Sequence, residues 1–549
     1  MANSDILENQ GKYSNNSADK NNPKLLIGNI LILLLIILLS LILLSPSNPY
    51  YSEPGRDSGF FMFTGRELLH GKELYTQIWD SKGPMIFFVN ALGFWLGGGT
   101  RWGLWFLELI LLVIGFGLAY SVLNKHWGHP AALFGIISGA FAFATIFGNG
   151  NTVEEYSLFF ALLSLYFYDK GLSTQNHRLS DLIIGASLMA SFHFRANNIG
   201  IEIIIIILII INAWKVSGFK STWPRIGWLF LGTLLVNLPI FLYFYLHGTL
   251  NEMFEASILY NFTYSQVYGS NSFLIRIIND SLLPGLVYFK GWSYVFGLGY
   301  LGCIYYAIRG WRQNKADPLV TLTLFLFPLE VILSAISGRR FEHYFINWIP
   351  TIILSSGILF KFAEEYLLSK DLIQTIKSKA KPYATVFVLI LIVAIYWEDI
   401  LTQSKVLYRY IKNPEQNIEF VSRTAKYISE NTNPDDKVLV IGGQCGINLM
   451  SNRSSIDGAL FYPLINNSPI GIRLQEEYYK NLKEQRPVLI VDGFALYPWH
   501  LPAVDPENRA KQKITSPLSQ NTDEVLNYVW ENYHLEYEVE GYSIYRINP

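Results

Sequence analysis

The sequence has little charge for its length. Only 15% of its 549 residues are Asp, Glu, Lys or Arg, whereas 51% are hydrophobic and 15% are aromatic. The mean hydropathy is +0.25. One water-soluble core cannot hide so much apolar surface, so the composition excludes an ordinary soluble protein and indicates an integral membrane protein. The net charge of -1 leaves no spare basic face, which argues against a nucleic-acid partner.

Cysteine is almost absent, which excludes a disulfide scaffold. Cys303 lies in an apolar segment and Cys445 in a polar one, so we expect no bridge between them. The N-terminal segment is polar and rich in Asn, and Leu25 to Leu44 then runs apolar for about the 20 residues that a spanning helix needs. No small-residue cleavage motif follows, so we expect a retained anchor rather than a signal peptide.

Long apolar segments between residues 25 and 400 predict about 11 transmembrane helices. Met85 to Gly99 is also apolar, but at 1.5 Å per residue it covers only ~22 Å, less than the ~30 Å hydrocarbon core. We therefore predict that this segment and the helix at 57–69 lie along the membrane surface. The predicted spans are Leu25–Leu44, Trp102–Leu123, Pro130–Phe147, Glu155–Tyr168, Leu179–Phe192, Ile199–Ala213, Ile226–Leu246, Val287–Ile308, Pro318–Ile336, Tyr344–Phe360 and Tyr383–Trp397.

The charges of the loops set the predicted orientation. With residues 1–24 as a cytoplasmic polar tail, the loops rich in Lys and Arg fall on the cytoplasmic side of the plasma (inner) membrane. Residues 45–101 then form the first outer loop, and everything after about Glu398 is extracytoplasmic. This assignment brings the charges nearest to the helix ends to the outer side, namely Asp57, Asp80, Lys82, Glu154, Glu155, Arg195, Arg339, Arg340, Glu342 and His343.

The composition changes again in residues 413–549. Strand-like runs at Lys437–Gly443, Arg486–Gly493 and Tyr542–Ile547 alternate with helix-like segments such as Asn417–Glu430. This pattern predicts a small extracytoplasmic α/β domain. The turn "GGQCG" (Gly442–Gly446) follows the first strand, but it lacks the G-x-G-x-x-G spacing of a dinucleotide site.

The segment Arg56–Phe106 carries an ordered series of motifs. An Asp follows the first span, a G-x-x-x-Y step and a D-x-K-x-P-M stretch come next, and an Arg leads the second span. The matching residues are Asp57, Gly71, Tyr75, Asp80, Lys82, Pro84, Met85 and Arg101. This segment resembles the first outer loop of C-type glycosyltransferases, in particular the protein-O-mannosyltransferase-like group that includes the lipid A aminoarabinose transferases. Gly148–Phe160 and Gly338–Pro350 are similar to later outer loops of these enzymes.

The resemblance implies a C-type (GT-C) glycosyltransferase fold and an inverting transfer of a monosaccharide from a polyprenyl-phosphate donor. The acceptor would be a lipid, glycan or protein at the outer face. The resemblance implies that Asp57 is the general base, that Lys82 contacts the lipid phosphate and that an acidic residue of the second loop orients the site. The predicted site residues are Asp57 for catalysis, Lys82, Arg340 and His343 for the phosphate or donor, and Glu154, Glu155 and Asp80 for the acceptor or for orientation.

The two central residues also have structural interpretations. Asp57 can cap the helix that starts there, which stabilises a helix by ~1 kcal/mol without any catalysis. Lys82 can extend its ammonium to lipid headgroups. The sequence differs from many C-type glycosyltransferases at Ser58, where a second acidic residue is usual. The acidic pair Glu154–Glu155 is also displaced relative to the family pattern, which leaves open which of the two residues faces the site.

The remaining charged residues have alternatives of the same kind. Glu154 and Glu155 can bind loop backbone instead of the acceptor. Arg340 and His343 can anchor at the interface or pair with Glu342, and Arg195 can neutralise Glu202 inside the bundle.

No D-x-D or His-rich spacing predicts a metal site, although Asp and Glu can hold Mg²⁺ or Mn²⁺. With Lys82 and an arginine available for the phosphate, catalysis that requires no cofactor is the simpler hypothesis. The expected partners are the lipid-linked donor, the bilayer and the acceptor.

Two other functions share some of these features. In a transporter or lipid-linked-glycan flippase, charges inside the spans line a pathway. This chain has few charges at mid-membrane and no inverted-repeat halves. A ligase that joins lipid-linked glycans uses the same donor but has a large outer loop between late spans, whereas the large polar part of this chain follows the last span.

Overall fold

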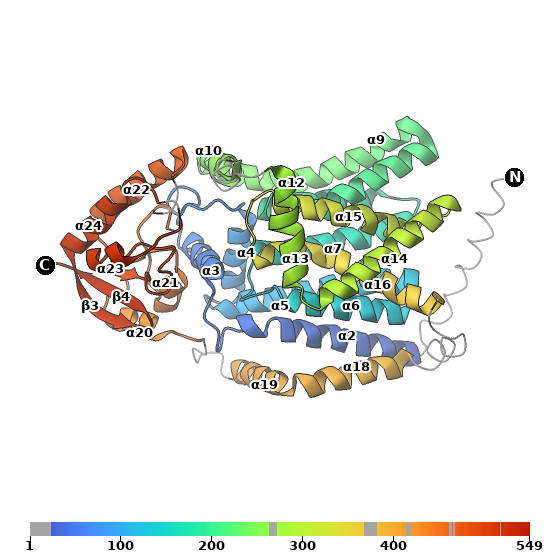
Figure 1. The fold of residues 1–549 in the computed structure, drawn as a ribbon, viewed down its shortest axis with the longest axis horizontal. Coiled ribbons are helices and arrows are strands. Elements are labelled where there is room, and N and C mark those ends of the chain that lie inside the picture. Colours follow the sequence, from blue (N-terminus) through green and yellow to red (C-terminus); the bar gives the residue numbers. More distant parts are fainter. Residues whose placement is uncertain are drawn as a thin grey trace.

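The structure is a computed structural model that describes residues 23–262, 272–366, 381–412, 419–460, 464, 467–516 and 518–549. A long bundle of helices carries a smaller α/β unit at one end (Figure 1). Residues 1–22 of the predicted tail and residues 413–418 at the predicted start of the C-terminal domain lie outside the described residues.

The bundle contains most of the predicted spans as helices. Its main members are α2 (Pro23–Leu43), α5 (Arg101–Trp127), α6 (His129–Ala144), α7 (Val153–Leu172), α8 (Arg178–Phe194), α9 (Gly200–Leu246), α14 (Trp292–Arg312), α15 (Pro318–Ala335), α16 (Ile349–Tyr366) and α18 (Lys381–Ile395). Two predicted spans, Ile199–Ala213 and Ile226–Leu246, both lie in α9. The predicted loop between them is helical except at Gly218, whose φ of 76° breaks the helix and suits glycine.

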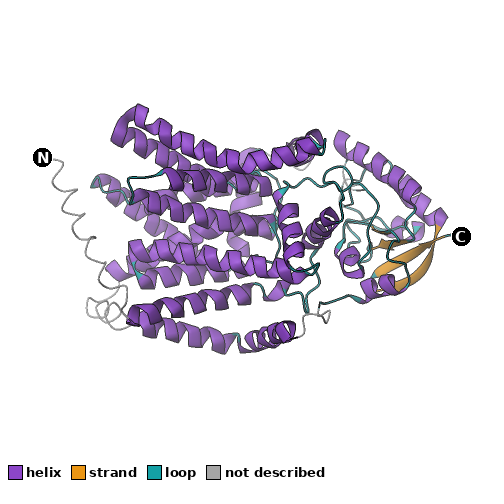
Figure 2. Cartoon of the chain, turned by 180° about the vertical axis from the view of Figure 1, so that it is seen from behind, coloured by secondary structure: helices purple, strands orange, loops and turns teal. Residues whose placement is uncertain are grey.

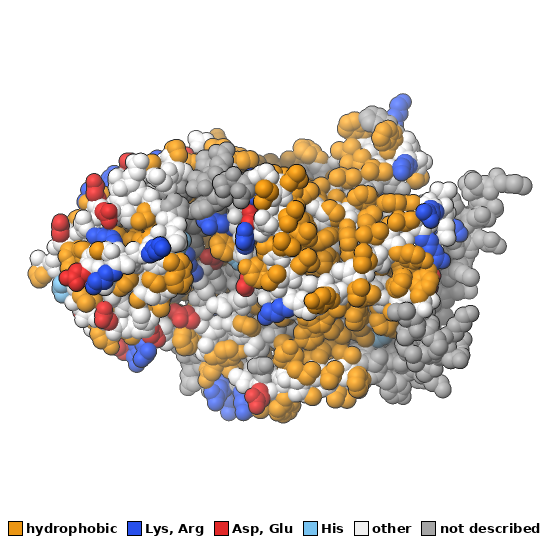
Figure 3. All heavy atoms as spheres, in the orientation of Figure 1, with side chains coloured by type: hydrophobic (Ala, Val, Ile, Leu, Met, Phe, Trp, Pro, Cys, Tyr) orange, Lys and Arg blue, Asp and Glu red, His pale blue; other side chains and the backbone are white. Residues whose placement is uncertain are grey.

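Five helices of the described residues are long and apolar enough to cross a membrane, and a sixth results if the bent pair 385–395 and 400–409 counts as one span. They are Leu26–Leu43, Arg101–Trp127, Thr222–Leu246, Pro318–Ala335 and Glu342–Tyr366. A broad apolar belt covers the bundle (Figure 3). The chain is a multi-pass membrane protein, but this criterion does not confirm the predicted total of about 11 crossings.

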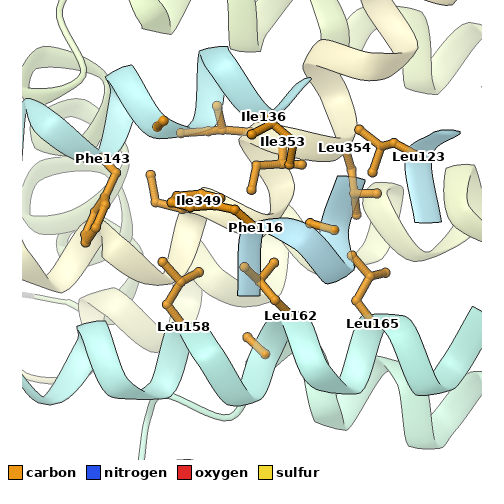
Figure 4. Packing of buried hydrophobic residues seen from close by; sticks show 14 of the residues in the cluster. Phe116, Leu123, Ile136, Phe143, Leu158, Leu162, Leu165, Ile349, Ile353 and Leu354 are labelled. Carbon is orange, nitrogen blue, oxygen red and sulfur yellow. The ribbon is translucent and has the colours of Figure 1, made fainter. Parts of the chain in front are cut away.

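Small residues let the central helices approach closely. An added Cβ at Gly139 of α6 would lie 2.3 Å from the Ile353 side chain of α16, and one at Gly135 would lie 2.8 Å from the Ile353 carbonyl oxygen. Between lipid-embedded helices, such close backbone contact supplies much of the association energy. The same core is filled by residues from four helices (Figure 4): Phe116, Leu123, Ile136, Phe143, Leu158, Leu162, Leu165, Ile349, Ile353 and Leu354.

Two short helices of residues 45–101, the predicted first outer loop and here called the first outer segment, lie between the bundle and the α/β unit. They are α3 (Arg56–Leu69) and α4 (Met85–Leu96). α4 has only 12 residues and is not among the helices able to span, which agrees with the prediction for Met85–Gly99. Other short elements are η1 (Ser45–Ser47), α10 (Leu250–Phe254), η2 (Glu255–Leu259), α12 (Phe273–Arg276), η3 (Ile277–Leu282), α13 (Leu283–Tyr288), η4 (Glu342–Trp348) and α19 (Trp397–Lys412).

The C-terminal unit contains a four-stranded mixed sheet in the order β1-β2-β4-β3. β1 (Val438–Val440) pairs in parallel with β2 (Leu489–Asp492), and β4 (Tyr542–Ile547) is antiparallel to both β2 and β3 (Tyr533–Val539). The helices of the unit are α20 (Arg423–Glu430), α21 (Gly446–Ser451), α22 (Pro469–Gln485), α23 (Pro506–Lys511) and α24 (Thr522–Asn532). In Figure 2 the sheet lies at the end of the molecule away from the bundle.

The predicted strands correspond to β1, β2 and β4. Edge strand β3 was not predicted, because its side chains are mostly exposed or half-buried and carry no apolar run. The helix predicted at Asn417–Glu430 begins only at Arg423, after an N-cap at Ser422 whose side chain accepts the Ala425 N–H.

The C-terminal unit and the first outer segment share one hydrophobic core. This core joins Phe60 and Phe61 of α3 to Leu449 of α21 and Tyr478 of α22. An added Cβ at Gly59 would lie 2.9 Å from the backbone of Gly446, so α3 and α21 touch backbone to backbone. α3 is therefore held between two structural units. Both cysteines are free, as the sequence predicts, and both are also buried.

Candidate functional site

A cavity of about 980 Å³ lies where the first outer segment, the bundle and the C-terminal unit meet. In Figure 3 the molecule is hollowed between the C-terminal unit and the bundle, and charged side chains border the hollow. The acidic, basic and histidine residues of the lining are Arg56, Asp57, Lys82, Glu154, His193, Arg195, Arg339, Glu342, His343 and His500. Four predicted site residues are thus brought together from three segments: Asp57 and Lys82 from the first outer segment, Glu154 from α7 and His343 from η4.

Asp57 lies in the first turn of α3. The N-cap of this helix is Gly55, and no side chain caps it. The alternative prediction, that Asp57 serves as the cap, is therefore wrong; the carboxylate lines the cavity instead. The preceding side chain turns toward the C-terminal unit, where Arg56 Nε donates a hydrogen bond of 2.9 Å to the Gly442 carbonyl oxygen.

Lys82 lies in a turn that is fixed from several sides. The Tyr75 hydroxyl donates to the Lys82 carbonyl oxygen at 2.7 Å, and the Lys82 N–H donates to Asp80 Oδ1 at 2.8 Å. The next residue, Gly83, packs so closely that an added Cβ would lie 2.0 Å from the His193 carbonyl oxygen. The D-x-K-x-P stretch thus builds a rigid platform for one lysine side chain.

The charges around Lys82 keep it protonated. Burial alone would lower the pKa of the ammonium, but the carboxylates of Asp80 and Asp57 outweigh burial and raise it above its usual range. For Asp80, burial raises the pKa even though Lys82 acts in the opposite direction. Asp80 is 2% exposed and is not part of the cavity lining, so its visible contribution is to hold the backbone of Lys82.

The adjacent residues Glu154 and Glu155 face different spaces. Both belong to the first turn of α7, where Thr152 caps the helix by accepting the Glu155 N–H at 3.3 Å. Glu154 lines the large cavity and forms an ion pair with Arg195. Glu155 lines a separate space of about 10 Å³ with Glu108 and Tyr156, between α5 and α7. The helix turns by about 100° per residue, which separates the two carboxylates.

Arg195 follows the last turn of α8 and contacts residues of two other segments, the start of α7 and η4. It pairs with Glu154, and its guanidinium carbon lies 3.5 Å from the centroid of the Tyr344 ring. The alternative prediction, that Arg195 neutralises Glu202, is wrong: Glu202 instead accepts a hydrogen bond of 3.2 Å from the Ser191 hydroxyl.

Arg340 and His343, the two residues after α15 that were predicted to bind the sugar donor, lie in different surroundings. His343 lines the cavity, and so does Arg339. Arg340 is not in the lining; its Nε lies 2.8 Å from Asp280 Oδ1 and its side chain is 60% exposed. The alternative partner predicted for Arg340, Glu342, is therefore not the one found.

His500 is the contribution of the C-terminal unit to the lining. Its Nδ1 hydrogen-bonds the Ser516 hydroxyl. Burial, followed by the positive charges of Arg56 and Arg339, lowers the pKa of His500 to about 4, so the ring is neutral at neutral pH. Sequence reasoning missed His500, because no local motif marks a histidine more than 400 residues from Asp57 as its neighbour.

Among the described residues, no group of three or more His, Cys, Asp or Glu side chains is arranged to hold a metal ion. The cations around the cavity come from Lys and Arg, which can neutralise a phosphate directly.

Residues 18–371 match the family of the competence-induced protein Ccs4 N-terminal domain. No curated protein matches the sequence. The structure is similar to that of ArnT from Cupriavidus metallidurans bound to undecaprenyl phosphate, with a TM-score of 0.59 and 11% identity over 94% of this chain and 98% of that chain. It is also similar to the archaeal oligosaccharyltransferase AglB from Archaeoglobus fulgidus in complex with an inhibitory peptide and a dolichol-phosphate, with a TM-score of 0.52 and 13% identity over 85% of this chain and 69% of that chain.

These similarities confirm the resemblance to C-type glycosyltransferases at the level of the fold. The match to ArnT covers nearly the whole of both chains, so the C-terminal unit is included in it.

Proposed function

Because the chain belongs to the competence-induced Ccs4 N-terminal domain family and has the fold of ArnT and AglB, we propose that it is a glycosyltransferase. It moves a monosaccharide from a polyprenyl-phosphate donor to an acceptor at the outer face of the plasma membrane, with the N-terminus in the cytoplasm and the C-terminal unit outside. The observation that carries this proposal is the meeting of Asp57 with Lys82 in one large cavity at the end of the bundle.

In the proposed reaction the acceptor hydroxyl attacks the anomeric carbon of the donor. Asp57 accepts the hydroxyl proton while the bond between the sugar and the lipid phosphate breaks, and the phosphate leaves on the polyprenyl chain. A single displacement of this kind inverts the configuration. Proton transfer to a positioned carboxylate contributes typically 10²–10⁴-fold to a rate.

Lys82 neutralises the leaving phosphate in this proposal. A fixed cation at the place where negative charge develops is worth roughly 2.7–4 kcal/mol, by analogy with a preorganised oxyanion site. The rigid turn around Lys82 supports this role, because a charge that is already in place needs no reorganisation during the reaction. His343 is a second donor-side candidate.

Glu154 and Arg195 are proposed to shape the same site as a pair. The ion pair holds the N-terminus of α7 against the segment after α8, and its guanidinium group packs on Tyr344. Arg340 has a weaker case as a donor residue than the sequence suggests, since it lies outside the lining and pairs with Asp280.

The proposed activity is tested with full-length protein in detergent and lipid-linked sugars carrying a radioactive label. We expect loss of donor and appearance of a labelled product when membrane lipids and envelope glycans are supplied, and mass spectrometry identifies both. A transporter or flippase leaves the label on the donor, so an unchanged donor in the presence of every acceptor would contradict the proposal. Because the proposed reaction needs no metal, we expect a chelator to leave the activity unchanged. We expect added Mg²⁺ or Mn²⁺ to leave it unchanged as well.

A further inference from the structure

The chain bends sharply between the bundle and the C-terminal unit. Helix α18 packs along α2, which is long and apolar enough to span a membrane. The next helix, α19, is turned by 82° from α18. In Figure 1 α18 and α2 lie side by side, whereas α19 is seen nearly end-on. A helix at this angle to the spans runs almost parallel to the membrane plane.

Contacts with α2 place α19 at the level where that span ends. Gln403 Nε2 donates a hydrogen bond of 2.7 Å to the carbonyl oxygen of Leu41, near the end of α2 at Leu43. Arg409 donates to the Tyr50 hydroxyl at 2.9 Å, in the segment that follows α2. Val406 is buried in the core of the bundle. One side of α19 is therefore fixed against the bundle at the membrane surface.

The opposite side of α19 carries an exposed apolar stripe. At about 100° per residue, the four side chains of this stripe lie within about 80° of the helix circumference. Helices with such a stripe bury it at the boundary between headgroups and acyl chains, where Trp and Tyr are also favoured. The residues and their exposed fractions are Trp397 (56%), Leu401 (37%), Tyr408 (63%) and Ile411 (75%).

Three cations line one edge of the apolar stripe. Lys405, Arg409 and Lys412 are all exposed, and their spacing places them within about 60° of each other on the helix. The Lys412 ammonium lies 5.8 Å from the centroid of the Tyr408 ring. In Figure 3, Lys and Arg side chains gather at α19 on the side toward the C-terminal unit, next to the apolar belt. Cations in this position attract the anionic headgroups of a bilayer.

We propose that α19 is an interfacial helix that binds anionic phospholipids of the outer leaflet. Its apolar stripe enters the acyl-chain boundary, and Lys405, Arg409 and Lys412 contact the phosphate headgroups. The acidic residues of the helix, Glu398 and Asp399, lie in its first turn, away from these cations in the sequence. The inference does not depend on sugar transfer; only the assignment to the outer leaflet rests on the proposed orientation.

The first test measures whether the stripe is in lipid. Full-length Tyr408→Cys and Thr402→Cys variants are labelled with an environment-sensitive dye and reconstituted in vesicles whose lipids are brominated in the acyl chains. Thr402 is the matched control, because it is exposed on the same helix but about 120° away from Tyr408. The wild type, whose two cysteines are buried, reports background labelling. We expect strong quenching at position 408 and weak quenching at 402. Weak quenching at both positions would overturn the proposal, and is the result expected if a second copy of the chain covers the stripe.

The second test measures the preference for anionic lipid. Energy transfer is recorded from the dye at position 402 to phosphatidylglycerol or phosphatidylcholine carrying the same acyl-chain fluorophore, at equal lipid fractions. We expect more transfer to phosphatidylglycerol, and a preference that falls as the salt concentration rises. Adding K405Q and K412Q should lower the preference by about fivefold or more, the effect of losing cations near a charged surface.

K426Q is the control for the second test. Lys426 is 68% exposed on α20 of the C-terminal unit and pairs with Glu430, so its loss should leave the lipid preference unchanged. Equal transfer to both lipids in the variant with only the dye label would overturn the proposal, as would a preference that survives K405Q and K412Q. Neither test requires turnover, so both results are independent of whether the protein transfers a sugar.

Discussion

The two walls of the cavity are built in different ways. The wall on the bundle is made of residues that belong to short local patterns, such as Asp57 at the start of α3 and Lys82 in its clamped turn. The wall on the C-terminal unit contributes His500, and it owes its place to contacts between segments about 400 residues apart. The first wall carries the residues to which we assign the proposed chemistry, and the second carries His500.

This difference shows that α3 contacts both walls of the cavity. Arg56 and Asp57 are neighbours in the chain, yet one side chain binds the C-terminal unit and the other faces the proposed reaction. A change at either wall therefore acts on α3, and variants can separate the contributions of chemistry and docking.

The largest effect is expected at the bundle wall, for Asp57→Asn. An amide cannot accept the acceptor proton, so turnover should fall by about 10²–10⁴-fold while binding of the lipid donor stays close to that of the wild type. Initial rates with a labelled donor measure the first quantity, and a donor-binding titration measures the second. Asp523→Asn is the matched control, because its side chain is 81% exposed on α24. Wild-type turnover in the Asp57 variant would remove this residue from the mechanism.

Lys82→Gln should lower kcat by about 10²–10³-fold, because the leaving phosphate loses its fixed cation. Lys82→Arg keeps the charge and should retain more activity than the glutamine variant. The raised pKa of Lys82 means that it stays protonated well above neutral pH, so its deprotonation should not limit the rate between pH 7 and 9. A pH profile of kcat for the wild type checks this point, and a fall in rate centred in that range that disappears in the arginine variant would contradict it.

The contact between the walls is tested by Arg66→Met in α3. This buried guanidinium pairs with Glu67 and donates to the carbonyl oxygens of Asn448, Leu449 and Arg453 in the C-terminal unit. Removing one partner of a buried ion pair typically costs 3–5 kcal/mol, so the docking of the unit should loosen. Hydrogen exchange of residues 446–458 should become faster, with turnover reduced as a consequence. Arg423→Met is the control, and unchanged protection of 446–458 in the Arg66 variant would show that the docking does not depend on this residue.

The bundle wall was largely predictable from the sequence. The fold was predicted from a resemblance to a known family, which the order of Asp57, Lys82 and Arg101 in the first outer segment carries. In the structure these residues lie in local turns and at helix ends, whose geometry depends on short stretches of sequence. Arg101 illustrates the limit of such reasoning: it was recognised as part of the pattern, and the structure shows its guanidinium donating to the backbone of Pro49, Ser52 and Phe420.

The C-terminal wall could not be predicted in the same way. Periodicity located β1, β2 and β4, but which loop of the unit reaches the cavity depends on how the sheet packs on α3, and only the folded chain contains that information. Arg339 and Arg340 show the same limit on a small scale. Both lie in one loop with the same charge, and the structure places the first at the cavity and pairs the second with Asp280.

The smallest effect concerns the pair Glu154 and Glu155, which the sequence could not tell apart. Glu154→Gln leaves Arg195 in the lining without its anionic partner, so turnover should fall by about 10-fold, a loss of ~1.4 kcal/mol. Glu155→Gln acts on the separate space beside Glu108 and should lower turnover far less. Steady-state rates of the two variants at saturating donor measure the contrast directly. The two changes are the same in chemistry and adjacent in sequence. A larger loss for Glu155 than for Glu154 would therefore show that the working site lies between α5 and α7, and not in the large cavity that Arg195 and Lys82 line.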